Sequence, residues 1–176
     1  MIQRRRTSKI KESQQKLRAR LWPGLDESML WHRKTKKGFI TIPRPMPLIM
    51  EIMDDLANGK PVSSAYLELW CRSFDEGFVT LSKQEDIAFA SGHSGQRSVS
   101  TWRQRLKTLH ELGFIDLKPG PAGAMSYALL WNPYLVIKNH REKGTPGLRA
   151  DLYNALVARA YEIGADDFDE AEEEAA

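Results

Sequence analysis

Four neighbouring segments in the middle of the chain predict two helices followed by two strands. Residues 95–112 carry apolar side chains three and four positions apart, as on one face of a helix, and a shorter helix is predicted at 82–90. Residues 114–117 and 126–131 are short apolar runs typical of strands. Residues 118–123, rich in Pro and Gly, predict a flexible turn between them. This order is typical of a winged helix-turn-helix.

Polar residues and a glycine mark the expected ends of the two helices. Ser82 and Glu85 have the spacing of a capping box, in which each side chain bonds the other residue's backbone N–H. Residues 91–93 form the expected turn. Ser94 is a suitable N-cap for the second helix, and Gly113 is a suitable stop.

The flanking segments predict further helices around this core. The expected elements are helices at residues 10–21, 48–57, 63–75 and 148–163, strands at 38–42 and 79–81, a turn or short helix at 134–137, and a linker at 143–147. The helix at 63–75 is apolar over a wide arc that includes Phe74, so we expect it in the centre of the core. Cys71 lies in the same apolar run and is expected to be a buried thiol.

These elements predict an α+β fold, mostly α with a small β wing, in which a winged helix-turn-helix core carries extra N- and C-terminal helices. A chain of 176 residues predicts one domain with appendages, or at most two small domains. The expected divisions are a basic N-terminal arm or helix at 1–25, a winged-helix domain at 26–137, a C-terminal amphipathic helix at 138–164, and an acidic disordered tail at 165–176.

Charge is unevenly distributed along the chain, although the net charge is only +3. Residues 1–20 contain eight Lys or Arg and one acid, whereas residues 165–176 contain seven acids and no base. Clustered basic residues are the electrostatic feature expected where a protein meets nucleic acid. The simpler alternative is that two solvated ends carry opposite charge. An acidic tail also permits a regulatory role, in which it covers the basic surface until DNA displaces it.

The helix at 95–112 has one apolar and one polar face. Val99, Trp102, Leu106 and Leu109 form the apolar face, which we expect to pack on the helices at 63–75 and 82–90. The other face carries Arg, Gln, Ser and Thr, which pair with guanine, adenine, phosphates and base edges. The residues expected to contact DNA are Gln96, Arg97, Ser100, Thr101, Arg103, Gln104 and Lys107 of this helix, Lys118 beside the predicted turn, and Arg4, Arg5 and Arg6 of the arm. The alternative is an ordinary solvated helix face.

The chain lacks the motifs of common enzymes and metal sites. There is no Gly-rich phosphate loop, no CxxC and no HExxH, and the four histidines lack metal-ligand spacing. We therefore expect no enzymatic activity, no cofactor and no metal. Residues 1–21 have no apolar segment of the kind found in signal peptides, and no stretch approaches the apolar length of a membrane span. A cytoplasmic protein is expected.

Three stretches, LSKQEDIAFASG at 81–92, RSVSTW at 97–102 and LHELGFI at 109–115, resemble the winged-helix core of bacterial transcriptional regulators and plasmid replication initiators. The block at 30–133 is also similar to a group of small proteins of proteobacterial plasmids and mobile elements. The resemblance implies a groove-reading role for Gln96, Arg97, Ser100, Thr101 and Gln104. It also implies a bacterial protein associated with the nucleoid or a plasmid. The chain departs from typical regulators in having no evident ligand-sensing domain, and from initiators in being short.

The sequence thus favours a protein that binds double-stranded DNA and acts in transcription regulation or in plasmid replication and maintenance. The alternative is a winged-helix module for protein interaction within a larger nucleoprotein assembly, without a specific DNA site of its own. The amphipathic helices at 10–21 and 148–163 are candidates for contact with a protein partner or a second copy. No membrane association is expected.

Overall fold

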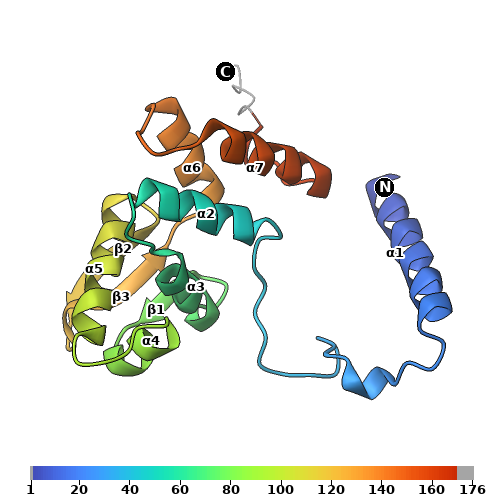
Figure 1. Cartoon of the computed structure of the whole chain (residues 1–176), viewed down its shortest axis with the longest axis horizontal. Helices are drawn as coiled ribbons and strands as arrows, with labels where there is room; N and C mark the ends of the chain where they lie inside the picture. Colours follow the sequence, from blue (N-terminus) through green and yellow to red (C-terminus); the bar gives the residue numbers. More distant parts are fainter. Residues whose placement is uncertain (1, 170–176) are drawn as a thin grey trace, which may run out of the picture. The chain divides into compact units, whose positions relative to one another are not determined.

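A computed structural model describes residues 2–169, apart from the side chains of residues 2–8 and 11. The chain divides into two compact units, Met1–Phe39 and Ile40–Ala176. Figure 1 shows the helices and strands of both units.

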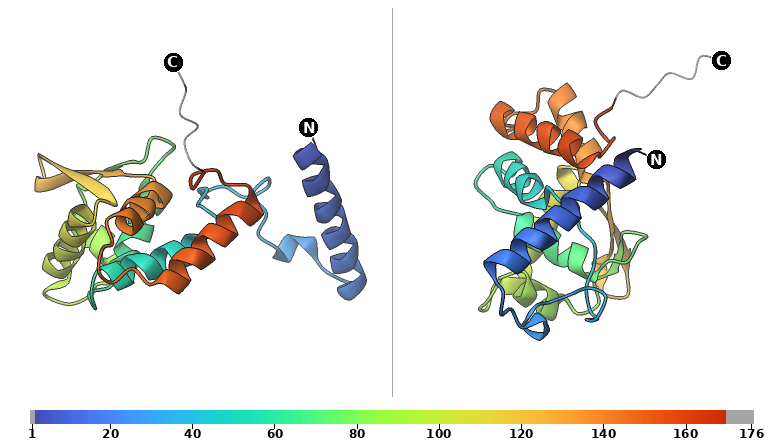
Figure 2. Two further views of the ribbon diagram at one scale, coloured as in Figure 1. Left: turned by 90° about the horizontal axis from the view of Figure 1, so that it is seen from above. Right: turned by 90° about the vertical axis from the view of Figure 1, so that its right-hand side faces the viewer.

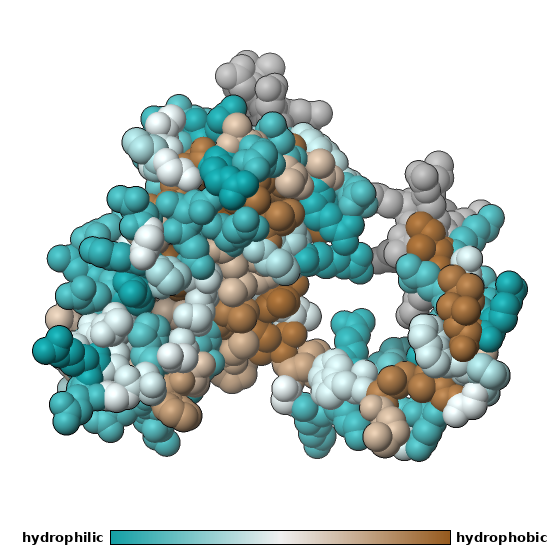
Figure 3. Space-filling view, in the orientation of Figure 1, coloured by the Kyte–Doolittle hydropathy of each residue, from teal (hydrophilic) through white to brown (hydrophobic). Residues whose placement is uncertain are grey.

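The first unit consists of helix α1 (Ile2–Leu21) and the short 3-10 helix η1 (Glu27–Met29). Arg18 and Glu27 form an ion pair, and the Trp31 and Phe39 rings meet edge to face at 5.8 Å. Apolar side chains lie along α1, where Ile10, Leu17 and Leu21 are about half exposed (Figure 3). None of the side chains described in this unit is buried, so its elements lack a core of their own.

The second unit holds the predicted core elements. In order, they are α2 (Met46–Leu56), α3 (Ser63–Arg72), β1 (Phe78–Thr80), α4 (Gln84–Ala90), α5 (Ser98–Glu111), β2 (Ile115–Gly120), β3 (Gly123–Leu130), α6 (Pro133–Glu142) and α7 (Ala150–Ile163). The α+β class expected from the sequence is therefore confirmed. The order of α3 to β3 is compatible with a winged-helix layout.

The three strands form one antiparallel sheet in the order β1-β3-β2. Its inner face contributes Val79, Ala128 and Ile115 to the core, all nearly inaccessible to solvent. Figure 2 (left) shows the strands along one side of the unit, with α5 and α2 on the other. Among the elements of this unit, the helices cover one face of the sheet only.

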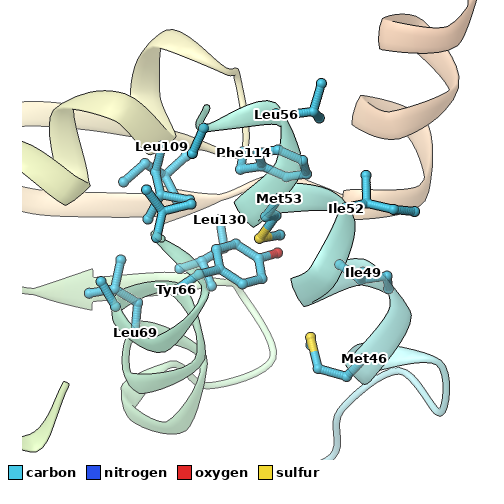
Figure 4. Close-up of a cluster of buried hydrophobic side chains, with 14 of the residues drawn as sticks. Met46, Ile49, Ile52, Met53, Leu56, Tyr66, Leu69, Leu109, Phe114 and Leu130 are labelled. Carbon is cyan, nitrogen blue, oxygen red and sulfur yellow. The ribbon is translucent and has the colours of Figure 1, made fainter. Parts of the chain in front are cut away.

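The core is centred on large side chains from α2, α3, α5 and the start of β2. Figure 4 shows Met53 of α2, Tyr66 of α3 and Phe114 pointing toward one another. The Tyr66 and Phe114 rings meet at 6.1 Å, and Trp102 of α5 is fully buried in the same cluster. The cluster fixes the position of α5, because it contains the whole apolar face of that helix.

Helix α7 is part of this unit and does not project from it. Leu152, Leu156 and Ala160 are buried, and α7 packs against α2. Beyond the helix, Phe168 packs edge to face on Tyr134 and Tyr153. The apolar face of α7 that was expected to meet a partner is thus covered within the chain.

Two segments in the C-terminal part of the chain differ from what the sequence predicts. Residues 165–169 were expected to begin a disordered tail, but burial of Phe168 holds this stretch against α6 and α7. The acids from Glu170 onward lie outside the described residues. The turn or short helix expected at 134–137 is a helix that extends further, α6, because Asn132 caps it with its side chain and Pro133 occupies its first position.

The strand expected at 38–42 is not formed. Within the described residues this segment has no ladder to another strand, and the prolines that follow it cannot donate backbone hydrogen bonds. The helix expected to reach residue 75 ends at Arg72, where the Ser73 hydroxyl bonds the carbonyl oxygen of Trp70. Phe74 therefore lies outside the core and is 84% exposed. Cys71 is exposed as well, so the expected buried thiol was wrong.

The predicted starts of α4 and α5 were also wrong. Helix α4 begins at Gln84 after Lys83, with no capping hydrogen bond from a side chain, so the Ser82–Glu85 capping box is not formed. Helix α5 begins at Ser98 with Arg97 as its N-cap residue, rather than at residue 95 after Ser94. Its end was predicted correctly: Gly113 has a φ of 79°, which favours glycine over other residues.

Candidate nucleic-acid interface

Helix α5 presents one face to the core and the opposite face to solvent. Trp102, Leu106 and Leu109 have no exposed surface, and Val99 packs partly against the core. These residues hold α5 against α3 and α4. The expectation that this apolar face packs on the two preceding helices is confirmed. The polar residues of α5 consequently line a fixed, outward-facing surface.

The structure leaves most of the predicted contact residues accessible. The exposed ones are Gln96, Arg97, Ser100, Arg103, Gln104, Lys107 and Lys118, whereas Thr101 is half-buried. Gln96 and Arg97 precede the helix and do not form its first turn. Arg4, Arg5 and Arg6 belong to α1 of the other unit, but their side chains lie outside the described part of the structure.

The start of α5 offers backbone donors to an anion. Arg97, the N-cap residue, makes no side-chain capping bond, and the Ser100 hydroxyl donates to the Arg97 carbonyl oxygen at 2.9 Å. The first N–H groups of a helix have no partner within that helix and carry partial positive charge. A phosphate at this end would meet these donors together with the exposed Arg97 guanidinium.

Arg103 is held in place by a residue that sequence reasoning did not identify. Its Nε donates to Oε1 of Gln84 at 2.7 Å, and Nε2 of Gln84 donates to the backbone oxygen of Met125 in β3 at 2.8 Å. Gln84 is only 8% exposed. The Gln84 side chain therefore connects α5 to the β2–β3 hairpin and fixes where Arg103 lies between them.

Two of the predicted basic residues have acidic neighbours. Lys107 lies 3.8 Å from Glu111 one turn further along α5, and Lys118 lies 3.0 Å from Asp116 on β2. The hydrogen bond from Lys118 is the main reason why the pKa of Asp116 lies below its usual value. Glu85 and Asp86 add exposed negative charge in the first turn of α4. Arg97 and Arg103 are thus exposed arginines of this surface that form no ion pair within the described residues.

The hairpin beside α5 is more ordered than the flexible tip expected at 118–123. The β2–β3 ladder continues to the pair Gly120 and Gly123, and the Ser126 hydroxyl both accepts from Ala122 N–H and donates to the Gly123 oxygen, each at 2.9 Å. A Cβ atom at Gly120 would lie 2.5 Å from the Tyr127 ring, so this position needs glycine. The turn itself carries no charged side chain.

The chain was compared with known protein families, with curated proteins and with solved structures. None of these comparisons found a match. None of the helices in residues 2–169 is long and apolar enough to cross a bilayer. Among those residues, no group of three His, Cys, Asp or Glu side chains is arranged to hold a metal ion. The exposed basic residues of α5 and the adjacent hairpin define the candidate interface.

Proposed function

We propose that this chain is a winged-helix protein that binds double-stranded DNA and acts in transcription regulation or in the replication or maintenance of a plasmid or mobile element. The observation that carries the proposal is the outward face of α5, where Arg97, Arg103 and Gln104 are exposed on a helix rigidly seated by its opposite face. An α-helix fits the major groove of B-DNA, and Arg and Gln are the side chains that pair best with guanine and adenine.

In the proposed complex, α5 lies in the major groove with its N-terminus nearest the DNA backbone. Arg97 and the free N–H groups of the first turn bind a phosphate, while Gln104 and Ser100 face base edges. Arg103, held by Gln84, contacts the backbone of the DNA strand that lies nearest the β2–β3 hairpin. Lys118 has a smaller role, because its charge is partly offset by Asp116. The basic residues of the N-terminal arm add phosphate contacts that do not depend on sequence.

Selection from a pool of duplex fragments, followed by a binding titration of the retained fragment at two salt concentrations, tests the proposal. The expected result is retention of a discrete fragment, with an affinity that falls steeply as salt rises because bound phosphates release counterions. Arg97→Ala should weaken binding by about 1–3 kcal/mol if the guanidinium reads a base, or reduce the salt slope by about 1 if it binds a phosphate.

Arg141→Ala is the matched control. Arg141 is also an exposed arginine, but it lies on α6 over the ring of Tyr153, at 5.4 Å from the ring centroid. The control protein should bind as the parent does. An Arg97→Ala protein that also binds as the parent does, or an affinity that does not change with salt, would contradict the proposal. No binding to any duplex would favour the protein-interaction module instead.

A further inference from the structure

The outer face of the β-sheet is apolar, although this face of a one-sided antiparallel sheet is normally polar. Side chains alternate along a strand, so β3 turns Tyr127 and Leu129 outward, in line with Trp131 just beyond its end. Phe78 of β1 joins them, and its ring stacks on that of Tyr127 at 5.7 Å. Phe78 and Trp131 are each 48% exposed.

The register places these side chains in two neighbouring rows across the sheet. One row contains Phe78, Leu129 and Asp116, and the next contains Thr80, Tyr127 and Lys118. Each row therefore has an aromatic or aliphatic residue on β3 and a charged residue on β2. The two charges are opposite and lie next to each other, 3.0 Å apart, so the face has a neutral rim. We call these six residues and Trp131 the outer sheet face.

We propose that the outer sheet face is a homodimer interface, in which a second copy of this chain packs its own outer sheet face against the first. Contiguous exposed apolar surface is a feature of interaction sites. The charge pattern of the outer sheet face favours a second copy of this chain as the partner. A neutral rim with one acid and one base does not favour nucleic acid or an anionic membrane, both of which attract basic surfaces. A second copy of this chain has the same neutral rim, in which an acid and a base can pair with the base and the acid of the first copy.

The geometry of a twofold dimer supports this match. A symmetric interface brings the same patch together from both subunits, so residue i meets residue j and j meets i. A twofold axis perpendicular to the strands and passing between the two rows puts Asp116 opposite the partner's Lys118 and Leu129 opposite the partner's Tyr127. Two sheets stacked in this way keep their strands nearly aligned, which is the usual packing of sheet on sheet. The interface uses none of the α5 residues and shares only Lys118 with the proposed DNA contacts, so self-association can be measured without DNA.

The first test is sedimentation of the full chain over a wide range of protein concentrations. A concentration-dependent dimer is expected, and Phe78→Ser should raise its dissociation constant about tenfold or more, because a central aromatic residue carries much of the affinity of an interface. Phe89→Ser is the matched control, since Phe89 is 74% exposed but lies on α4. It should leave the dimer unchanged. A chain that stays monomeric, or a dimer that Phe78→Ser does not weaken, would overturn the proposal.

A charge-swap pair tests whether the partner is a second copy in this arrangement. Asp116→Lys alone and Lys118→Asp alone should each weaken self-association at least about tenfold, because like charges then face each other across the axis. Mixing the two variant proteins should restore the dimer, since an all-basic rim then meets an all-acidic one. Circular dichroism of each variant confirms that it is folded. A mixture as weakly associated as its components would refute the twofold arrangement.

Discussion

Arg103 on α5 and Gln84 at the start of α4 are joined by a hydrogen bond of 2.7 Å from the guanidinium Nε to the amide oxygen. The same amide donates to the backbone of Met125, so Gln84 uses both ends of its side chain at once. A buried amide in this position stabilises the fold, because its removal leaves the Met125 oxygen and the Arg103 Nε–H without a protein partner.

We expect Gln84→Ala to lower the free energy of unfolding by about 1–3 kcal/mol, the usual cost of leaving a buried hydrogen-bonding group unpaired. Urea denaturation followed by circular dichroism measures the change. Gln104→Ala is the control, because Gln104 is an exposed glutamine on α5 and its loss should change stability by no more than about 0.5 kcal/mol. Equal stability of the two variants would show that the link through Gln84 is not stabilising.

Helix α3 depends on a cap supplied from a different helix. Its N-cap residue, Val62, has no side chain that can accept a hydrogen bond. Asp54 of α2 does so instead: one carboxylate oxygen accepts from the N–H groups of Val62 and Ser63, at 2.6 and 2.9 Å, and the other accepts from the Ser63 hydroxyl at 2.7 Å.

Asp54→Ala should therefore destabilise the protein by about 1–2 kcal/mol, as expected for loss of a helix cap. Thermal unfolding by calorimetry gives the change, with Asp75→Ala as an exposed aspartate control outside any helix. Asp54→Asn should retain part of the stability, because an amide oxygen can still accept. A stability of Asp54→Ala equal to that of the control would argue against a capping role for this carboxylate.

Periodicity predicted most of the helices and strands that form, but it did not predict the contacts that position them. The spacing of Trp102, Leu106 and Leu109 was sufficient to assign the buried face of α5, since that face depends only on residues within the helix. The link from Gln84 to Arg103 and Met125 joins three elements far apart in sequence, and Asp54 acts across a turn. Local patterns contain no signal for such contacts.

The failed local predictions share a physical cause. The residues predicted as caps, Ser82 and Ser94, were chosen by type alone, whereas each helix starts where its apolar face meets the core. Phe74 was assigned to the core by its hydrophobicity, but α3 had already ended at Arg72. The sequence around Phe168 gives no signal of its burial, because its neighbours are acids. Its burial between Tyr134 and Tyr153 depends on the packing of α6 and α7.

Phe168→Ala should lower the free energy of unfolding by on the order of 3 kcal/mol, because the side chain is only 8% exposed and its loss leaves a cavity between two tyrosine rings. Chemical denaturation gives the value. Phe89→Ala, at a phenylalanine that is 74% exposed, should cost no more than about 0.5 kcal/mol. A cost for Phe168→Ala as small as that of the control would show that this residue does not anchor the chain after α7.

The anchoring role of Phe168 determines how the acidic tail has to be tested. Deletion of residues 165–176 would remove Phe168 together with the acids and so mix a loss of stability with a loss of charge. Deletion of residues 170–176 removes four glutamates and three alanines and leaves Phe168 in place. If these acids compete with DNA for the basic surface, this shorter deletion should tighten DNA binding, most strongly at low salt. Unchanged affinity at low salt would eliminate the competition.

The single cysteine should react slowly with alkylating reagents at neutral pH, although it is exposed. Partial burial of the thiol is the main cause that raises the pKa of Cys71, and the nearby Glu68 carboxylate raises it further. The thiolate is the reactive form, so a raised pKa lowers the rate at pH 7 and moves the midpoint of the rate profile to a higher pH. Iodoacetamide kinetics on the folded protein, compared with the urea-unfolded chain at the same pH, measure this difference. Glu68→Gln removes one negative charge and should increase the rate at neutral pH. The explanation would fail if the folded thiol reacted at least as fast as the unfolded one, or if Glu68→Gln slowed the reaction.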